Sequence, residues 1–90
     1  MQKDKIHMET RVALIGIIIE EKTLVSQLNE IISEYSDYVI GRMGIPYPKK
    51  NISVISLAVD APSDIISAIS GKIGRLEGIS VKTVYSKSNV

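Results

Sequence analysis

The sequence predicts a small α+β domain in which four strands form an antiparallel sheet and two helices cover one face of it. Two observations lead to this fold class. Short runs rich in β-branched residues alternate with two segments whose apolar residues recur at helical spacing. In addition, a chain of 90 residues can build one hydrophobic core but has no room for a second domain.

The N-terminal half begins with a predicted strand at residues 10–19, a β-branched run too short for a buried helix. Charged residues at 20–22 end this strand. A helix is predicted from Thr23 to Tyr35, because the apolar side chains there fall on one face of a helix. These side chains are Leu24, Val25, Leu28, Ile31, Ile32 and Tyr35.

The middle of the chain predicts a hairpin of two strands, at residues 38–45 and 52–59. Gly41 and Gly44 interrupt the first of these strands, which indicates a bulge or a close approach of another backbone. Residues 46–51 are predicted as a loop, because the two prolines in this segment have no N–H group to donate to a neighbouring strand.

A second helix is predicted to begin within residues 60–64, where Asp60 and Asp64 are interpreted as capping acids around a proline. Its apolar face comprises Ile65, Ile66, Ile69, Ile73 and Leu76. Gly78 is predicted to cap its C-terminus, and residues 79–85 alternate in polarity like a fourth strand. Gly71 and Gly74 are costly inside a helix, so both are predicted to pack closely against a neighbouring element.

The resulting order, β-α-β-β-α-β, is that of a ferredoxin-like fold. Right-handed crossovers place both helices on one face of the sheet and the first and third strands at its centre. Residues 10–87 are assigned to this single domain. Residues 1–9 are interpreted as a disordered or tag-like terminus, and His7 within them as a solvated residue rather than a metal ligand.

Both central strands are apolar on both faces. In the first strand, one face carries Val12, Leu14 and Ile18, and the other carries Ala13, Ile15, Ile17 and Ile19. In the third strand, Ile55, Leu57 and Val59 oppose Ile52, Val54 and Ala58. Because helices cover only one face, the second face is predicted to pack against another copy of the chain in a homodimer or homotetramer. The alternative is an uncovered face that is simply richer in apolar residues than average.

Composition excludes several function classes. The absence of cysteine and the presence of one histidine exclude an iron–sulfur cluster, a Cys-ligated zinc, a thiol nucleophile and a multi-His metal site within one chain, so no metal or cofactor is expected. A net charge of +1 and central strands without aromatic residues argue against direct nucleic-acid binding. No apolar run approaches the roughly 20 residues of a membrane span, and no signal peptide is recognisable, so a cytoplasmic location is expected.

The most specific candidate for a ligand site is the segment that contains Gly41, Arg42, Gly44 and Tyr47. The glycines admit a close approach, the guanidinium suits a carboxylate or phosphate, and the tyrosine offers a ring and a hydroxyl. Together they predict a site for an anion or a small metabolite. The alternative interpretation is a bulged edge strand with a protective charge. The serines have no histidine base near them in sequence, which argues against a serine nucleophile. No acid–base pair or other nucleophile constellation is visible, so the chain is predicted not to be an enzyme.

Several segments also resemble one family. They are residues 11–16, 40–47, 59–62, 70–74 and 78–83. Over about residues 10–86, the chain resembles the iron-only hydrogenase system regulators, small ACT-like proteins of anaerobic bacteria. The resemblance implies a relationship to ACT domains and to the effector domain of nickel-responsive repressors, which oligomerise through their sheets and bind small effectors at subunit interfaces.

Two departures limit what the resemblance implies. The Asp-x-x-Gly turn of an ACT amino-acid site is missing at residues 20–23, and the His and Cys ligands of a nickel site are absent. The resemblance therefore implies neither an amino acid nor nickel as the effector of this chain. The expected function is a non-enzymatic regulatory or sensor domain, acting as a homo-oligomer with a small effector at a subunit interface. Without a DNA-binding element, any control of transcription would need a partner protein. The alternative is a ligand-free protein–protein interaction module in hydrogenase maturation.

Overall fold

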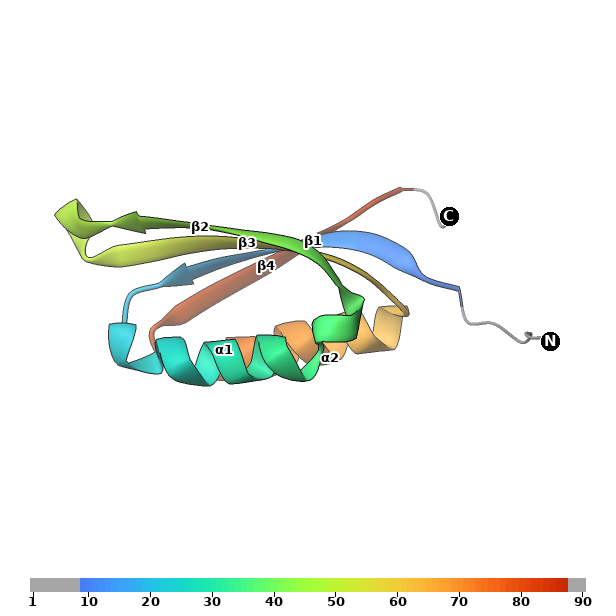
Figure 1. The fold of residues 1–90 in the computed structure, drawn as a ribbon, viewed down its shortest axis with the longest axis horizontal. Coiled ribbons are helices and arrows are strands. Elements are labelled where there is room, and N and C mark those ends of the chain that lie inside the picture. The colour runs from blue at the N-terminus through green and yellow to red at the C-terminus, as the bar shows by residue number, and fades with distance from the viewer. Residues whose placement is uncertain (1–8, 88–90) are drawn as a thin grey trace.

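The computed structural model describes residues 9–87 as a four-stranded antiparallel sheet with two helices on one face (Figure 1). The strand order is β2-β3-β1-β4, which places the first and third strands at the centre as predicted. The elements are β1 (Arg11–Ile19), α1 (Val25–Glu34), β2 (Val39–Tyr47), β3 (Ile52–Ala61), α2 (Ser63–Gly74) and β4 (Ile79–Tyr85). The predicted α+β class and element order are confirmed. Residues 1–8, including His7, lie outside the described residues.

The hydrophobic core lies between the sheet and the helices. On β1, Ile15 and Ile17 are fully buried, and Ile15 lies opposite the buried Leu57 of β3. From the helices, the buried core residues are Leu28, Ile32, Ile66, Ile69 and Ile73. Each fully buried Ile or Leu contributes about 1.5–3 kcal/mol through removal of its apolar surface from water. The predicted alternation of β1 and β3 is confirmed, because the buried residues of both strands occupy one face.

The loop predicted at residues 46–51 is shorter in the structure. β2 continues to Tyr47, and Pro46 pairs opposite Ser53 of β3. Proline is tolerated there because β2 is an edge strand, whose outer side needs no N–H donor within the sheet. The connection is a single 3₁₀ turn, Pro48–Lys50, followed by Asn51 in the left-handed conformation at φ 57°. Asparagine is one of the few residues that adopts this conformation readily.

The start of α2 also differs from the prediction. β3 runs through Asp60 to Ala61, and Asp60 lies opposite Val12 of β1. The prediction that Asp60 caps the helix is therefore wrong. No side chain caps α2, and the carbonyl of its N-cap residue Pro62 accepts the N–H groups of Ile65 and Ile66. Asp64 does lie in the first turn, where a negative charge is favourable to the helix dipole.

The glycines at the other end of α2 agree with the predictions only in part. The helix ends at Gly74 with Arg75 as its cap, so Gly78 is not the cap and lies in the following turn at φ +81°. Gly74 packs closely, since an added Cβ would lie 3.2 Å from Val81. An added Cβ at Gly71 would meet nothing within 4 Å, so close packing there is not confirmed.

Candidate functional site

The sheet surface opposite the helices, here called the open face, is apolar and uncovered. Three neighbouring rows of residues cross it from β2 to β4. They are Gly41, Ala58, Leu14 and Val84, then Met43, Ser56, Gly16 and Lys82, then Ile45, Val54, Ile18 and Ser80. On this face Leu14 is 48% exposed and Met43 is 65% exposed, whereas Ile15 on the helix side is fully buried. Exposed apolar side chains that are contiguous over several strands are typical of an interaction surface.

Small residues create two hollows on the open face. One, of about 350 Å³, lies beside Gly41 and is lined by Leu14, Gly41, Arg42, Met43, Ser56 and Ala58. The other, of about 280 Å³, lies over Gly16 and is lined by Gly16, Ile17, Ile18, Val54, Ser80, Val81 and Lys82. Both hollows suit an apolar side chain or the apolar part of a small molecule.

The structure divides the four predicted ligand residues between the two faces of β2. Gly41 and Tyr47 lie on the open face with Met43 and Ile45, at opposite ends of that group. Arg42 and Gly44 are on the helix side, opposite Leu57 and Ile55. The four residues therefore do not form one cluster.

Arg42 has a partner on the helix side. Its Nη2 atom donates a hydrogen bond of 3.1 Å to Oδ1 of Asn29 in α1. This contact directs the guanidinium toward the helix layer, although Arg42 is also one of the residues that line the hollow beside Gly41. Arg42 thus lies at the border between the two faces, at the exposed edge of the sheet.

Gly41 follows an irregularity in the edge strand. The pairing of β2 with β3 shifts between Val39 and Gly41, as expected for a β-bulge. An added Cβ at Gly41 would meet nothing within 4 Å, and one at Gly44 would make an ordinary 3.9 Å contact with Ile55. The packing of this chain therefore does not require glycine at either position.

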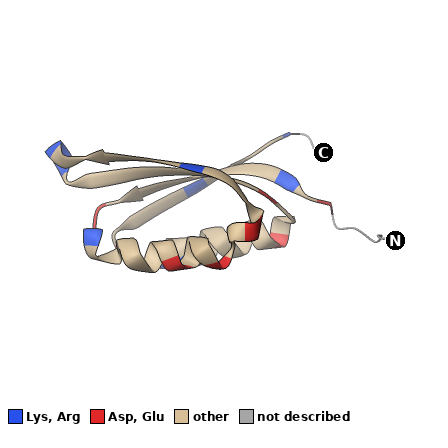
Figure 2. Ribbon diagram, in the orientation of Figure 1, with Lys and Arg blue, Asp and Glu red and all other residues tan. Residues whose placement is uncertain are grey.

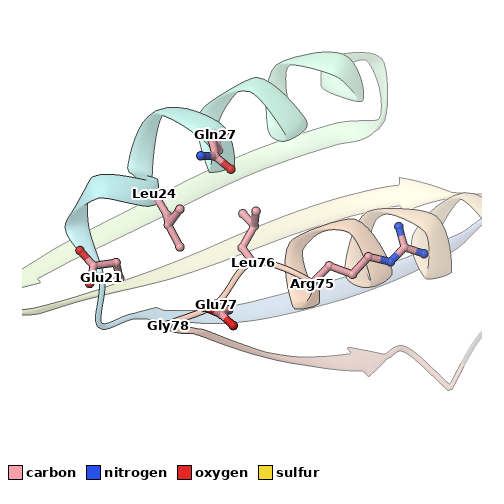
Figure 3. Close-up of a pocket in the computed structure, with 7 residues that line it drawn as sticks. All are labelled: Glu21, Leu24, Gln27, Arg75, Leu76, Glu77 and Gly78. Atoms are coloured by element: carbon pink, nitrogen blue, oxygen red, sulfur yellow. The ribbon is translucent and has the colours of Figure 1, made fainter.

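A larger hollow of about 500 Å³ lies at the end of the helix layer, and sequence analysis did not identify it. It is lined by Glu21, Leu24, Gln27, Arg75, Leu76, Glu77 and Gly78 (Figure 3). These residues come from two segments that are distant in sequence and carry no shared motif. Figure 3 shows the carboxylate of Glu21 and the guanidinium of Arg75 pointing away from each other, with Leu24 and Leu76 between them. Because its charges do not converge, this hollow is a weaker candidate than the open face.

The chain matches the family model TM1266-like, described as "Iron-only hydrogenase system regulator, putative", over residues 11–83. It belongs to this family. Among solved structures, the uncharacterized protein TM1266 from Thermotoga maritima is similar, with 32% sequence identity and a TM-score of 0.84 over 88% of this chain and 100% of that chain. No curated protein matches the chain. The family expected from the sequence motifs is thus confirmed, and so is the ferredoxin-like fold.

Two further findings bear on this TM1266-like domain. Within residues 9–87, no three His, Cys, Asp or Glu side chains gather in a group that could hold a metal ion. In the same part of the chain, the helices are too short or too polar for any of them to cross a membrane.

Proposed function

We propose that this member of the regulator family is non-enzymatic and works as a homo-oligomer joined through the open face. A small effector would bind in the hollow beside Gly41, where two copies meet. The observation that carries the proposal is the uncovered apolar surface on the central strands. Leu14 and Ile18 of β1 are 48% and 40% exposed beside Val54 of β3 at 37%. Burying such a surface against a second copy removes it from water and stabilises the assembly.

The chemistry of the hollow supports binding rather than turnover. Its polar lining residues are Ser56 and Arg42, and the guanidinium of Arg42 donates to Asn29 of α1. Elsewhere, the hydroxyls of Ser70 and Thr83 lie 2.6 Å apart and satisfy each other. Neither arrangement includes a general base beside a nucleophile, which covalent catalysis requires.

Regulation would follow from the position of the hollow. An effector that touches two copies stabilises the subunit arrangement in which both contacts are made. Coupling of this kind amounts to about 1–3 kcal/mol, a 5- to 150-fold change in affinity for the next partner. A partner protein of the iron-only hydrogenase system would recognise and bind that subunit arrangement.

A thermal-shift screen of amino acids, nucleotides and small metabolites tests the effector site. Gly41→Val fills the hollow at a position where an added Cβ meets nothing in the chain. Gly71→Ala is the matched control, because its Cβ also meets nothing within 4 Å but lies on α2. A compound should raise the Tm of the wild type and of Gly71→Ala, and should fail to do so for Gly41→Val. A screen without hits, or hits that Gly41→Val leaves unchanged, would contradict this site.

One observation favours a second candidate function, a ligand-free interaction module. The guanidinium of Arg42 donates a hydrogen bond to Asn29. The strongest hydrogen-bond donor for an anion in the predicted site is therefore turned away from the open face. A stable protein partner recovered by co-purification, together with an empty thermal-shift screen, would support this candidate over the sensor.

A further inference from the structure

The open face carries very little charge. Figure 2 shows Lys and Arg at the tip of the β2–β3 hairpin and Asp and Glu along the helices, with few coloured segments in the strands. Among the strand positions of residues 9–87 that face away from the helices, the charged residues are Asp60 of β3 and Lys82 of β4. Both are exposed, and their charges are opposite.

The strand register places these two residues symmetrically about Leu14. Asp60 lies opposite Val12 of β1, and Lys82 lies opposite Gly16 of the same strand. β3 and β4 flank β1 on its two sides. Leu14 is midway between Val12 and Gly16 along β1, so the line that joins Asp60 to Lys82 passes over Leu14 at its midpoint.

We propose that a second copy of this chain covers the open face about a two-fold axis that passes over Leu14. A two-fold axis that lies in the plane between the two sheets, perpendicular to the line between Asp60 and Lys82, brings each Asp60 against the partner's Lys82. Leu14 then meets the equivalent residue of the other copy. This inference rests on the proposed function, since it specifies the geometry of the oligomer proposed there.

The surface around Leu14 fits such an arrangement. In the row of Leu14, the neighbours Ala58 and Val84 are apolar, and Val84 is 67% exposed. The two charges lie on either side of this apolar centre, in the pattern of a hydrophobic core with a polar rim. A two-fold interface makes every contact twice, so one attractive charge pair per copy becomes two.

The two charges also disfavour other ways of stacking the sheets. A register that placed Lys82 or Asp60 against the apolar centre would bury an unpaired charge, which is strongly unfavourable. The same pair therefore selects one orientation of the second copy and rejects the alternatives. A purely apolar face would allow the copies to slide over each other.

Cross-linking tests the geometry directly, because the chain contains no cysteine. Stacked sheets lie ~10 Å apart, which is too far for a disulfide, so a short bismaleimide is the suitable reagent. Leu14→Cys should give cross-linked dimers by itself. Asp60→Cys and Lys82→Cys should each cross-link poorly alone and efficiently after the two variants are unfolded and refolded together. Cross-linking of each variant alone, with no gain on mixing, would overturn the proposed axis.

Charge exchange provides the second test, read by sedimentation velocity. Asp60→Lys and Lys82→Glu should each weaken the dimer by at least about tenfold, and the double exchange should restore it. Lys50→Glu, at the hairpin tip, is the control that should leave the dimer unchanged. If the wild type sediments as a monomer, the proposed oligomer itself fails. If the wild type is an oligomer but the exchanges have no effect, this axis fails while the proposed function stands.

Discussion

Gly78 lies so close to Glu21 that a Cβ atom at position 78 would lie 2.6 Å from the Cβ of Glu21. The backbone of Gly78 has a φ of +81°, in the left-handed region that side chains disfavour. Beside this contact, the N–H of Glu20 donates a 2.8 Å hydrogen bond to the carbonyl of Gly78. The turn before β4 is thus held against the end of β1 at a point where only glycine fits.

We expect Gly78→Ala to lower the free energy of unfolding by about 2–3 kcal/mol, through the disfavoured φ and the clash with Glu21. Urea denaturation measures this loss. Gly71→Ala is the matched control, because its Cβ meets nothing within 4 Å and α2 should gain about 0.5–1 kcal/mol from alanine. Equal stability of Gly78→Ala and the wild type would show that the turn relaxes without strain.

A polar contact fastens α2 to β4. The hydroxyl oxygens of Ser70 and Thr83 lie 2.6 Å apart in a partly buried position. We expect Ser70→Ala to cost about 1–2 kcal/mol, because it leaves the Thr83 hydroxyl without this partner. The double variant Ser70→Ala/Thr83→Val should cost less than the sum of the two single changes. Strict additivity in a double-mutant cycle would contradict the coupling.

Lys72 of α2 links the two helices at the C-terminal end of α1. Its Nζ atom lies 3.0 Å from Oε2 of Glu34 and 5.0 Å from the centre of the Tyr35 ring. The Tyr35 side chain, and after it the Glu34 carboxylate, raise the pKa of Lys72 above its ordinary value of 10.5. The stabilisation that protonated Lys72 gives the folded state is therefore fully present below pH 10.5. It is lost as the pH rises through the higher pKa that Lys72 has in the folded state.

We expect Lys72→Met to be less stable than the wild type near neutral pH, with the difference shrinking above pH 10.5. Because the pair is largely exposed, added salt should also reduce the difference. Urea denaturation across alkaline pH, with Lys50→Met at the hairpin tip as the control, measures both effects. A difference that did not change with pH would show that Lys72 acts through packing alone.

Elements with a clear period could be predicted from the sequence. The alternation of β1 and the helical spacing of α1 both reflect a single buried face. The local sequence of each segment is therefore enough to predict its secondary structure. The errors occurred where tertiary context decides. Pro46 is tolerated in a strand only because β2 lies at the edge of the sheet. Asp60 resembles a helix cap in sequence, but β3 continues through it because Val12 offers a pairing partner.

The candidate site was only partly predictable, for a similar reason. Sequence proximity brought Gly41, Arg42, Gly44 and Tyr47 into one hypothesis, although alternate residues of a strand point to opposite faces. Applying that period to residues 41–47 would have separated Arg42 and Gly44 from the other two. The contact between Arg42 and Asn29 joins residues of different elements, so no local pattern could have indicated it.

Ile17 and Ile18 are adjacent in β1 and distinguish the two faces of the sheet. Ile17 is 1% exposed in the core, whereas Ile18 is 40% exposed on the open face. Ile17→Ala should cost about 2–5 kcal/mol at every protein concentration, because it leaves a cavity under the helices. Ile18→Ala should change the stability of the isolated subunit little but weaken the proposed oligomer.

Because association stabilises the folded state by mass action, the Tm of the wild type should rise with protein concentration. Ile18→Ala should reduce that rise, and thermal unfolding over a wide concentration range measures it. A wild-type Tm that is independent of concentration would argue against an oligomer that depends on the open face.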